Sequence, residues 1–184
     1  MEDRRIRKTK TAFYKALIQL LKKDELRNIS IQELCDLADS HRSTFYYHYA
    51  DIYALYEEME NRILGEFAST LSAGVYRDYP SMYEAVIDCI NKNLETWTVL
   101  LDMKSFHRKV CDLLEEKFLE IWQYETGRKK FSPQFHILLK ASAAGFVSLF
   151  TQYLNSDEDY PDEMIKSLLG DMDDAFDMML EKNL

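Results

Sequence analysis

Hydrophobic residues recur every three or four positions along most of the chain, which is the spacing of one face of an α-helix. Stripes of this kind predict helices at residues 4–23, 51–71, 81–101, 105–125, 132–155 and 162–182. Residue types typical of strands do not alternate with polar residues over any long stretch. The pattern therefore predicts an all-α protein.

A helix-turn-helix pattern lies between the first two of these helices. Ser30 and Glu33 form a capping box, so a short helix begins there and ends before the polar pair Asp39-Ser40. A second short helix, residues 41–47, has one strong apolar anchor, Phe45. Two such helices allow the first to brace the second in a DNA major groove. An ordinary helical hairpin on a protein surface would show the same spacing.

The residues themselves, ISIQELCDLADSHRSTFYYHYADIYAL, resemble the DNA-binding signature of the TetR family of bacterial transcriptional regulators. The matching positions are Ile31, Leu34, Ala38, Thr44, Phe45, Tyr46, His48, Tyr49 and Leu55. Three positions depart from the family pattern, because Asp39 stands for its turn glycine, His41 for its helix-capping serine and Ile52 for a lysine that touches a phosphate. We therefore expect a less comfortable turn and one phosphate contact fewer than a typical member makes.

The resemblance implies a three-helix DNA-binding head at residues 1–50. A helical body for dimerisation and ligand binding would follow at residues 51–184, beginning with a connecting helix at 51–71. As a homodimer, the protein would read a near-palindromic operator in double-stranded DNA, and a small-molecule effector would alter its affinity. The expected DNA-binding residues are Arg4, Arg5, Lys8, Ser30, His41, Arg42, Ser43, Thr44, Tyr46, Tyr47 and His48.

The body is also similar, in the stretch 145–154 and in its acidic loop and last helix, to regulators associated with dihydroxyacetone kinase operons. Some of those regulators are activators that work with a partner protein. The resemblance therefore leaves both repression and activation open.

Charge is distributed unevenly along the chain, whose net charge is −9. Residues 1–50 contain ten Lys and Arg against seven Asp and Glu, a net charge of +3, whereas residues 51–184 contain 13 against 25, a net charge of −12. Neutralisation of DNA phosphates needs the basic residues where the head has them, and the acidic body would be repelled by DNA. This division favours docking by the head alone.

Composition and motifs narrow the remaining classes. No run of about 18 apolar residues occurs and no apolar segment follows the basic N-terminus, so we expect a cytoplasmic protein rather than a membrane or secreted one. Neither a glycine-rich phosphate loop nor a nucleophile elbow is present, and we expect no enzyme and no cofactor. His107 and Cys111 are spaced like two metal ligands, but two ligands do not make a site, so no metal is expected.

Two further sites are expected in the body. Aromatic, sulfur-containing and polar side chains on the helices at 81–101 and 105–125 are typical of a small-molecule pocket, although an ordinary core would use the same residues. The expected ligand-binding residues are Cys89, Asn93, Trp97, Met103, His107 and Trp122. The helix at 132–155 is apolar around most of its surface, so it and the last helix are expected to form the dimer interface. The expected interface residues are Ala141, Gly145, Phe146, Leu149, Leu168, Met172, Phe176 and Met179.

Two other functions compete with a DNA-binding regulator. One is a helical protein-interaction (co-regulator) protein whose DNA contacts have weakened, as Asp39, His41, Ile52 and the acidic body would allow. The other is a protein that sequesters a small ligand. Salt-dependent binding to DNA separates the first from the leading function, and ligand binding that is indifferent to the head would indicate the second.

Overall fold

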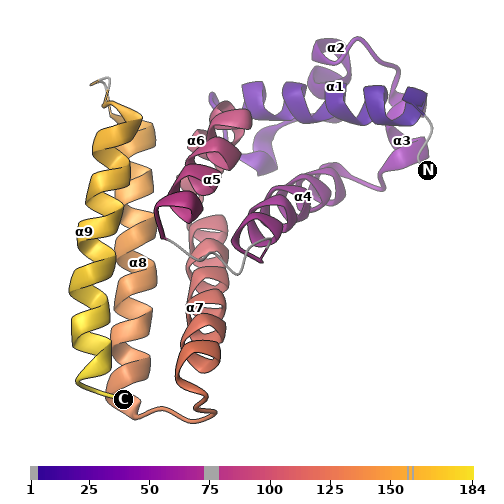
Figure 1. The fold of residues 1–184 in the computed structure, drawn as a ribbon. Helices are drawn as coiled ribbons and strands as arrows, with labels where there is room; N and C mark the ends of the chain where they lie inside the picture. Colours follow the sequence, from indigo (N-terminus) through magenta and orange to yellow (C-terminus); the bar gives the residue numbers. More distant parts are fainter. Residues whose placement is uncertain (1–3, 73–78, 157, 159) are drawn as a thin grey trace. The chain divides into compact units, whose positions relative to one another are not determined.

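All regular secondary structure in the described part of the chain is helical, as the sequence predicts. The structure, a computed structural model, describes residues 4–72, 79–156, 158 and 160–184. Its helices are α1 (Arg4–Leu21), α2 (Ile31–Leu37), α3 (Arg42–His48), α4 (Ile52–Ser72), α5 (Tyr79–Lys92), α6 (Leu94–Leu101), α7 (Lys104–Thr126), α8 (Pro133–Asn155) and α9 (Asp162–Glu181), with a short 3₁₀ turn at Leu26–Asn28 (Figure 1). Most of the linker predicted at 72–80 lies outside the described residues.

The chain divides into two compact units, residues 1–64 and residues 65–184, here called the N-terminal and C-terminal units. The division falls inside α4, which therefore contributes its first part to one unit and its last part to the other. The boundary expected after residue 50 concerns which residues bind DNA, and it stays a prediction.

In the N-terminal unit, local signals in the sequence set where the helices begin. The Ser30 hydroxyl accepts a hydrogen bond from the Glu33 amide at 3.2 Å, and the Ser30 amide donates to the Glu33 carboxylate at 3.0 Å. The predicted capping box is therefore formed at the start of α2. The Asp51 carboxylate accepts from the amide of Ala54 at 2.9 Å, which caps α4 in the same way.

The core of the N-terminal unit is aromatic. Phe45 is completely buried, and its ring centroid lies 5.5 Å from that of Phe13 on α1 and 5.6 Å from that of Tyr49. The Phe13 and Phe45 rings meet edge to face, the arrangement that aromatic rings favour. Phe45 is thus the anchor that the sequence predicts for the second helix of the helix-turn-helix.

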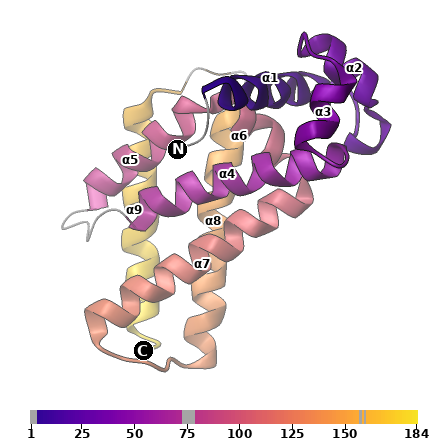
Figure 2. The same cartoon turned by 90° about the vertical axis from the view of Figure 1, so that its right-hand side faces the viewer.

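In the C-terminal unit, α8 is the central helix and packs against α6, α7 and α9. Figures 1 and 2 both show α8 and α9 lying side by side along most of their length. Ser132 caps α8 by accepting from the Phe135 amide at 3.0 Å, with Pro133 in the first turn as expected. Of the described helices, only α8 is long and apolar enough to cross a membrane, and its packing on three neighbours is that of a core helix.

The single helix predicted at 81–101 is wrong, because the chain forms two helices there, α5 and α6. Asn93 leaves helical geometry, with φ −131° and ψ 35°, and its side-chain amide donates to Glu66 of α4 at 3.1 Å. Apolar spacing continues across the break, which explains why periodicity alone missed it. Leu94, predicted to face inward, is exposed.

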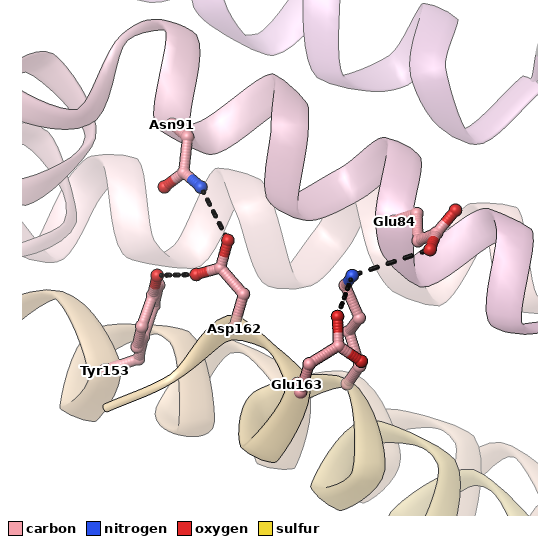
Figure 3. A network of polar contacts seen from close by, with 6 residues as sticks. Glu84, Asn91, Tyr153, Asp162 and Glu163 are labelled. Atoms are coloured by element: carbon pink, nitrogen blue, oxygen red, sulfur yellow. Dashed lines mark hydrogen bonds and ion pairs between the residues drawn. The ribbon is translucent and has the colours of Figure 1, made fainter. Parts of the chain in front are cut away.

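Polar contacts fasten the first turn of α9 to its neighbours (Figure 3). The Asp162 carboxylate accepts from the Tyr153 hydroxyl of α8 at 2.7 Å and from the Asn91 amide of α5 at 3.4 Å. Lys166 pairs with Glu163 in its own helix at 2.9 Å and with Glu84 of α5 at 3.5 Å. Acidic residues in a first turn also complement the helix dipole, so these contacts fix where α9 begins.

Candidate nucleic-acid interface

Helices α2 and α3 form a helix-turn-helix whose turn contains one strained residue. Asp39 has φ 49°, and it is the one residue other than glycine with a positive φ in the described part of the chain. The Ser40 amide donates to the Cys35 carbonyl at 2.9 Å and closes the turn. His41 occupies the N-cap of α3 without a side-chain capping bond. The departures at Asp39 and His41 therefore cost local stability, but they do not prevent the motif from forming.

Helix α3 has one buried and one exposed face. Phe45 points into the core, whereas the opposite face is open to solvent and leaves the Tyr47 side chain 79% exposed. The exposed face consists of Arg42, Ser43, Tyr46 and Tyr47, with His41 before it and with Thr44 and His48 half-buried at its edges. These seven residues all belong to the predicted DNA-binding set. A helix this short with so many exposed hydrogen-bonding side chains is suited to reading base edges.

Contacts between neighbours order part of this exposed face. The Arg42 guanidinium lies 6.0 Å from the centroid of the Tyr46 ring, and the Tyr47 and His48 rings lie edge to face at 4.9 Å. Each such exposed contact contributes little energy. Their effect is to keep a cation and two aromatic rings on one surface, where phosphate and base contacts would be made together.

The remaining predicted DNA-binding residues lie outside α3. Arg4, Arg5 and Lys8 are exposed at the start of α1. Ser30 is exposed as well, but its hydroxyl is already engaged with Glu33, both accepting from the amide and donating to the carboxylate at 2.7 Å. A DNA contact by Ser30 would therefore compete with the cap of α2.

One part of the site was missed by the sequence predictions, a polar cluster centred on Glu58 of α4. The Glu58 carboxylate accepts hydrogen bonds from the Tyr14 hydroxyl, from the Tyr49 hydroxyl at 2.9 Å and from the Lys10 ammonium at 2.9 Å. The Arg62 guanidinium lies 5.1 Å from the Tyr14 ring centroid. The cluster joins α1 and the residue that follows α3 to the first half of α4, and thereby sets the orientation of α3 within its unit.

The electrostatics of this cluster favour a charged carboxylate. Burial acts to raise the pKa of Glu58, but the hydrogen bonds from Tyr14, Lys10 and Tyr49 outweigh it and hold that pKa below its usual range. Burial and the hydrogen bond to Glu58 raise the pKa of Tyr14 to about 12. Burial likewise raises the pKa of Tyr49. Both tyrosines therefore remain protonated donors at neutral pH. The partners of Glu58 lie 44 and 48 positions away along the chain, except Tyr49, and short-range patterns do not show such pairings.

The residues expected to line one ligand pocket are divided among several places in the C-terminal unit. Cys89 and Asn93 line a wide cleft that is open to solvent, between α5 and the last part of α4. Trp97 is buried in the core, with its ring centroid 5.2 Å from that of Phe67 and 5.5 Å from that of Phe106. These three residues therefore do not line a common cavity.

The other three expected ligand residues lie on α7 or at its start. Met103 occupies the N-cap of α7 and is half-buried. His107 is also half-buried, with its Nδ1 atom 3.8 Å from the sulfur of Cys111. Across the described residues, no third His, Cys, Asp or Glu joins that pair. Trp122 lines a different cavity, among α5, α7, α8 and α9.

Two residues of the expected dimer interface are used inside the chain. A Cβ atom at Gly145 would lie 3.2 Å from the terminal methyl of Met172, so Gly145 allows α8 and α9 of one chain to approach closely. Phe146 is buried, with its ring 5.2 Å from that of Phe118 on α7. A partner chain therefore could not contact Phe146, which corrects that part of the expectation.

An apolar strip nevertheless remains on the outer faces of α8 and α9. Its exposed members are Ile137, Ala141, Ala144, Leu168, Met178 and Met179, and the half-buried ones are Leu149, Met172 and Phe176. Six of these nine residues belong to the expected interface. Contiguous apolar surface of this kind commonly marks a protein–protein contact.

Comparison with known proteins identifies the architecture. A crystal structure of a TetR transcriptional regulator from Streptococcus agalactiae superimposes with a TM-score of 0.62, over 97% of this chain and 96% of that chain, at 23% sequence identity. The fold is that of TetR-type regulators. Protein-family models and curated proteins provide no match to the sequence.

Two further structures share this TetR-type fold. The dihydroxyacetone kinase operon activator DhaS superimposes with a TM-score of 0.61 at 12% identity, over 95% of this chain and 97% of that one. A TetR family protein from Vibrio parahaemolyticus gives a TM-score of 0.59 at 20% identity, over 91% of this chain and 97% of that one. The expected fold is therefore confirmed along nearly the whole chain, including the likeness of the body to a dihydroxyacetone kinase operon regulator.

Proposed function

We propose that the protein is a DNA-binding transcriptional regulator that reads the major groove with α3. The observation that carries this proposal is the exposed face of α3, where Arg42, Tyr46 and Tyr47 lie opposite the buried anchor Phe45. On a TetR-type fold, this is the helix that would enter the groove. The protein would then act in the cytoplasm by binding rather than by catalysis.

Charge supports docking through the N-terminal end of the chain. The excess of basic residues in positions 1–50 includes the exposed Arg4, Arg5 and Lys8 of α1. These side chains would contact phosphates beside the groove that α3 reads, and the acidic remainder of the chain would stay away from the DNA.

A homodimer would supply two copies of α3. The apolar strip on α8 and α9 is the surface through which two chains would associate, since two-fold pairing of these helices buries the strip on both chains. A stable homodimer would bury more than about 1,000 Å² in total. The operator would then contain two inverted half-sites about one helical turn, or a multiple of it, apart.

The alternative, a protein-interaction module with weakened DNA binding, has one specific observation in its favour. Ile52 stands where the TetR-family pattern has a phosphate-contacting lysine, and its side chain is buried. It therefore supplies no phosphate contact, and Asp39 and His41 weaken the motif around it. On that alternative, the surface of α3 would bind a protein.

Selection of binding sites from a pool of random duplex DNA tests the proposal. The full-length protein is expected to enrich a near-palindromic sequence at low salt, and competitor DNA of unrelated sequence should not displace it. A pool that shows no enrichment over several rounds would contradict DNA reading and would favour the interaction module. Either sign of regulation is compatible with this result, because the similar DhaS is named an activator.

A further inference from the structure

The C-terminal unit contains a cavity among α5, α7, α8 and α9 (Figure 1). It has about 370 Å³ of empty space, part of which is open to solvent. Four aromatic rings contribute to its wall, those of Phe118, Trp122, Phe146 and Phe176. The volume is at the lower end of the range of about 300–1,000 Å³ for small-molecule sites. The cavity would therefore fit a compact ligand with an apolar body.

Two carboxylates interrupt this aromatic wall. Asp173 and Asp177 lie one turn apart on α9, so both line the cavity from the same side. Among the described residues, neither has an ion-pair partner, and the charged groups that act on them are all acidic. Those groups are Glu125 on α7 and Asp174 and Glu181 on α9. The cavity therefore concentrates negative charge with no resident cation to balance it.

This arrangement is unfavourable for the ionised protein on its own. Burial raises the pKa of Asp177 to about 7, and repulsion from Asp173 and Glu125 adds to the effect. Burial also raises the pKa of Asp173, although a hydrogen bond from Tyr83 acts in the opposite direction. A cation placed between the two carboxylates would remove the repulsion and restore both groups to their charged state.

We propose that this cavity binds an organic cation, whose ammonium group would lie beside Asp173 and Asp177 and whose apolar body would lie against the aromatic wall. The faces of Trp122 and the neighbouring phenyl rings attract cations that have been removed from water. A divalent metal ion fits the site less well, because it needs six or more oxygen ligands and the remaining wall is largely apolar.

A second cavity adjoins the first and extends the apolar part of the site. It has about 290 Å³ of empty space, and it shares Met82, Phe118 and Phe146 with the first cavity as common wall. Leu71, Val86 and Leu169 are among its other lining residues. Because a methionine side chain repacks easily, movement of Met82 would connect the two spaces. The site therefore favours a cation with an aromatic or branched alkyl substituent over a bare ammonium ion.

This site differs from the pocket expected from the sequence, with which it shares only Trp122. Its identification as an effector site rests on the proposed regulatory function, whereas the binding of a cation does not. Ligand binding and DNA binding are therefore measured separately.

The test uses benzyltrimethylammonium chloride as probe and the full-length protein at constant ionic strength. Trp122 lines the cavity and Trp97 does not, so a Trp97→Phe variant makes Trp122 the only tryptophan reporter. We expect a saturable change in Trp122 fluorescence and a higher melting temperature, both absent with benzenesulfonate at the same concentration. Lack of a saturable response at pH 8, where Asp177 is ionised, would overturn the proposal.

Charge-removing variants locate the binding site. Asp173→Asn and Asp177→Asn should each weaken binding of the probe at least tenfold at pH 8, whereas Asp174→Asn, a change at an exposed neighbour on α9, should alter it less than twofold. Asp177→Asn should also raise the melting temperature of the free protein at pH 8, which shows that the variant folds. Equal weakening by all three variants would mean general charge attraction, and unchanged binding in Asp173→Asn and Asp177→Asn would mean another site; either result overturns the proposal.

Binding of the probe without any selected DNA sequence would leave the cation site standing and would contradict the regulatory function. A selected operator together with no probe binding would do the opposite. If both are found, the probe should change the affinity for the operator in the wild-type protein but not in Asp177→Asn.

Discussion

Removing the Phe45 ring tests how the N-terminal unit is held together. Phe45 is completely buried and forms close ring contacts with Phe13, Tyr46 and Tyr49. Substitution of a buried phenylalanine by alanine typically costs about 3–5 kcal/mol, because transfer free energy and packing are both lost. A unit of this size has only about 3–10 kcal/mol of stability at the usual 0.05–0.15 kcal/mol per residue. Phe45→Ala should therefore remove most of the stability of the N-terminal unit.

The positions of the tryptophans make this loss measurable by unit. Both Trp97 and Trp122 belong to the C-terminal unit, so tryptophan fluorescence follows that unit, while far-UV circular dichroism follows all helices. In urea, Phe45→Ala should lose part of its helical signal at low denaturant, and the fluorescence transition should remain near its wild-type midpoint. Operator binding should be lost in parallel with the early transition.

A matched control exists in the other unit. Phe106 is also completely buried, and its ring lies 5.5 Å from that of Trp97. Phe106→Ala should therefore shift the fluorescence transition instead. A Phe45→Ala protein whose helical signal unfolds at the wild-type midpoint would refute the role given to this ring.

Three further changes probe the turn, the Glu58 cluster and the dimer. Asp39→Gly should raise the melting temperature, because a residue with a side chain at φ 49° bears a strain of about 1 kcal/mol that glycine avoids; a lower melting temperature would show that the aspartate side chain makes a stabilising contact. Glu58→Gln should destabilise the protein at pH 7. Since the pKa of Glu58 is depressed in the folded state, the stability that its charge contributes is present above the unfolded pKa of about 4.3 and is lost as the pH falls through the folded pKa, so denaturation curves of wild type and variant should converge in acid and a pH-independent difference would contradict this account. Met179→Glu, on the exposed apolar strip, should convert a dimer into a folded monomer in sedimentation at micromolar concentration; a wild-type protein that sediments as a monomer would contradict the interface.

Local signals allowed much of the N-terminal unit to be predicted from sequence. The capping box at Ser30, the αL turn at Asp39 and the anchor Phe45 each depend on residues a few positions apart, and the structure contains all three. The orientation of α3 was not predictable in the same way. It depends on Glu58 meeting Lys10 and Tyr14, which are distant in sequence and which no periodicity connects.

The C-terminal unit shows where periodicity is insufficient. It identified the apolar faces of the helices but not which faces meet. Gly145 and Phe146 were therefore assigned to a partner chain, although α9 and α7 of the same chain cover them. The acidic cavity was missed for a related reason, since Asp173 and Asp177 resemble a solvated helix face until the packing places them beside Trp122.

The most direct test of the central claim is the affinity of the purified protein for its selected duplex across a series of salt concentrations. The wild-type affinity should fall steeply and linearly on a log–log plot, because phosphate contacts release counterions. Tyr47→Ala should weaken specific binding at least tenfold, about 1.4 kcal/mol, while leaving the melting temperature unchanged, since Tyr47 is 79% exposed. Tyr124→Ala, at a 77% exposed position of α7, is the matched control and should bind like wild type. If the Tyr47→Ala protein binds the selected duplex as tightly as the Tyr124→Ala protein, α3 is not the reading helix.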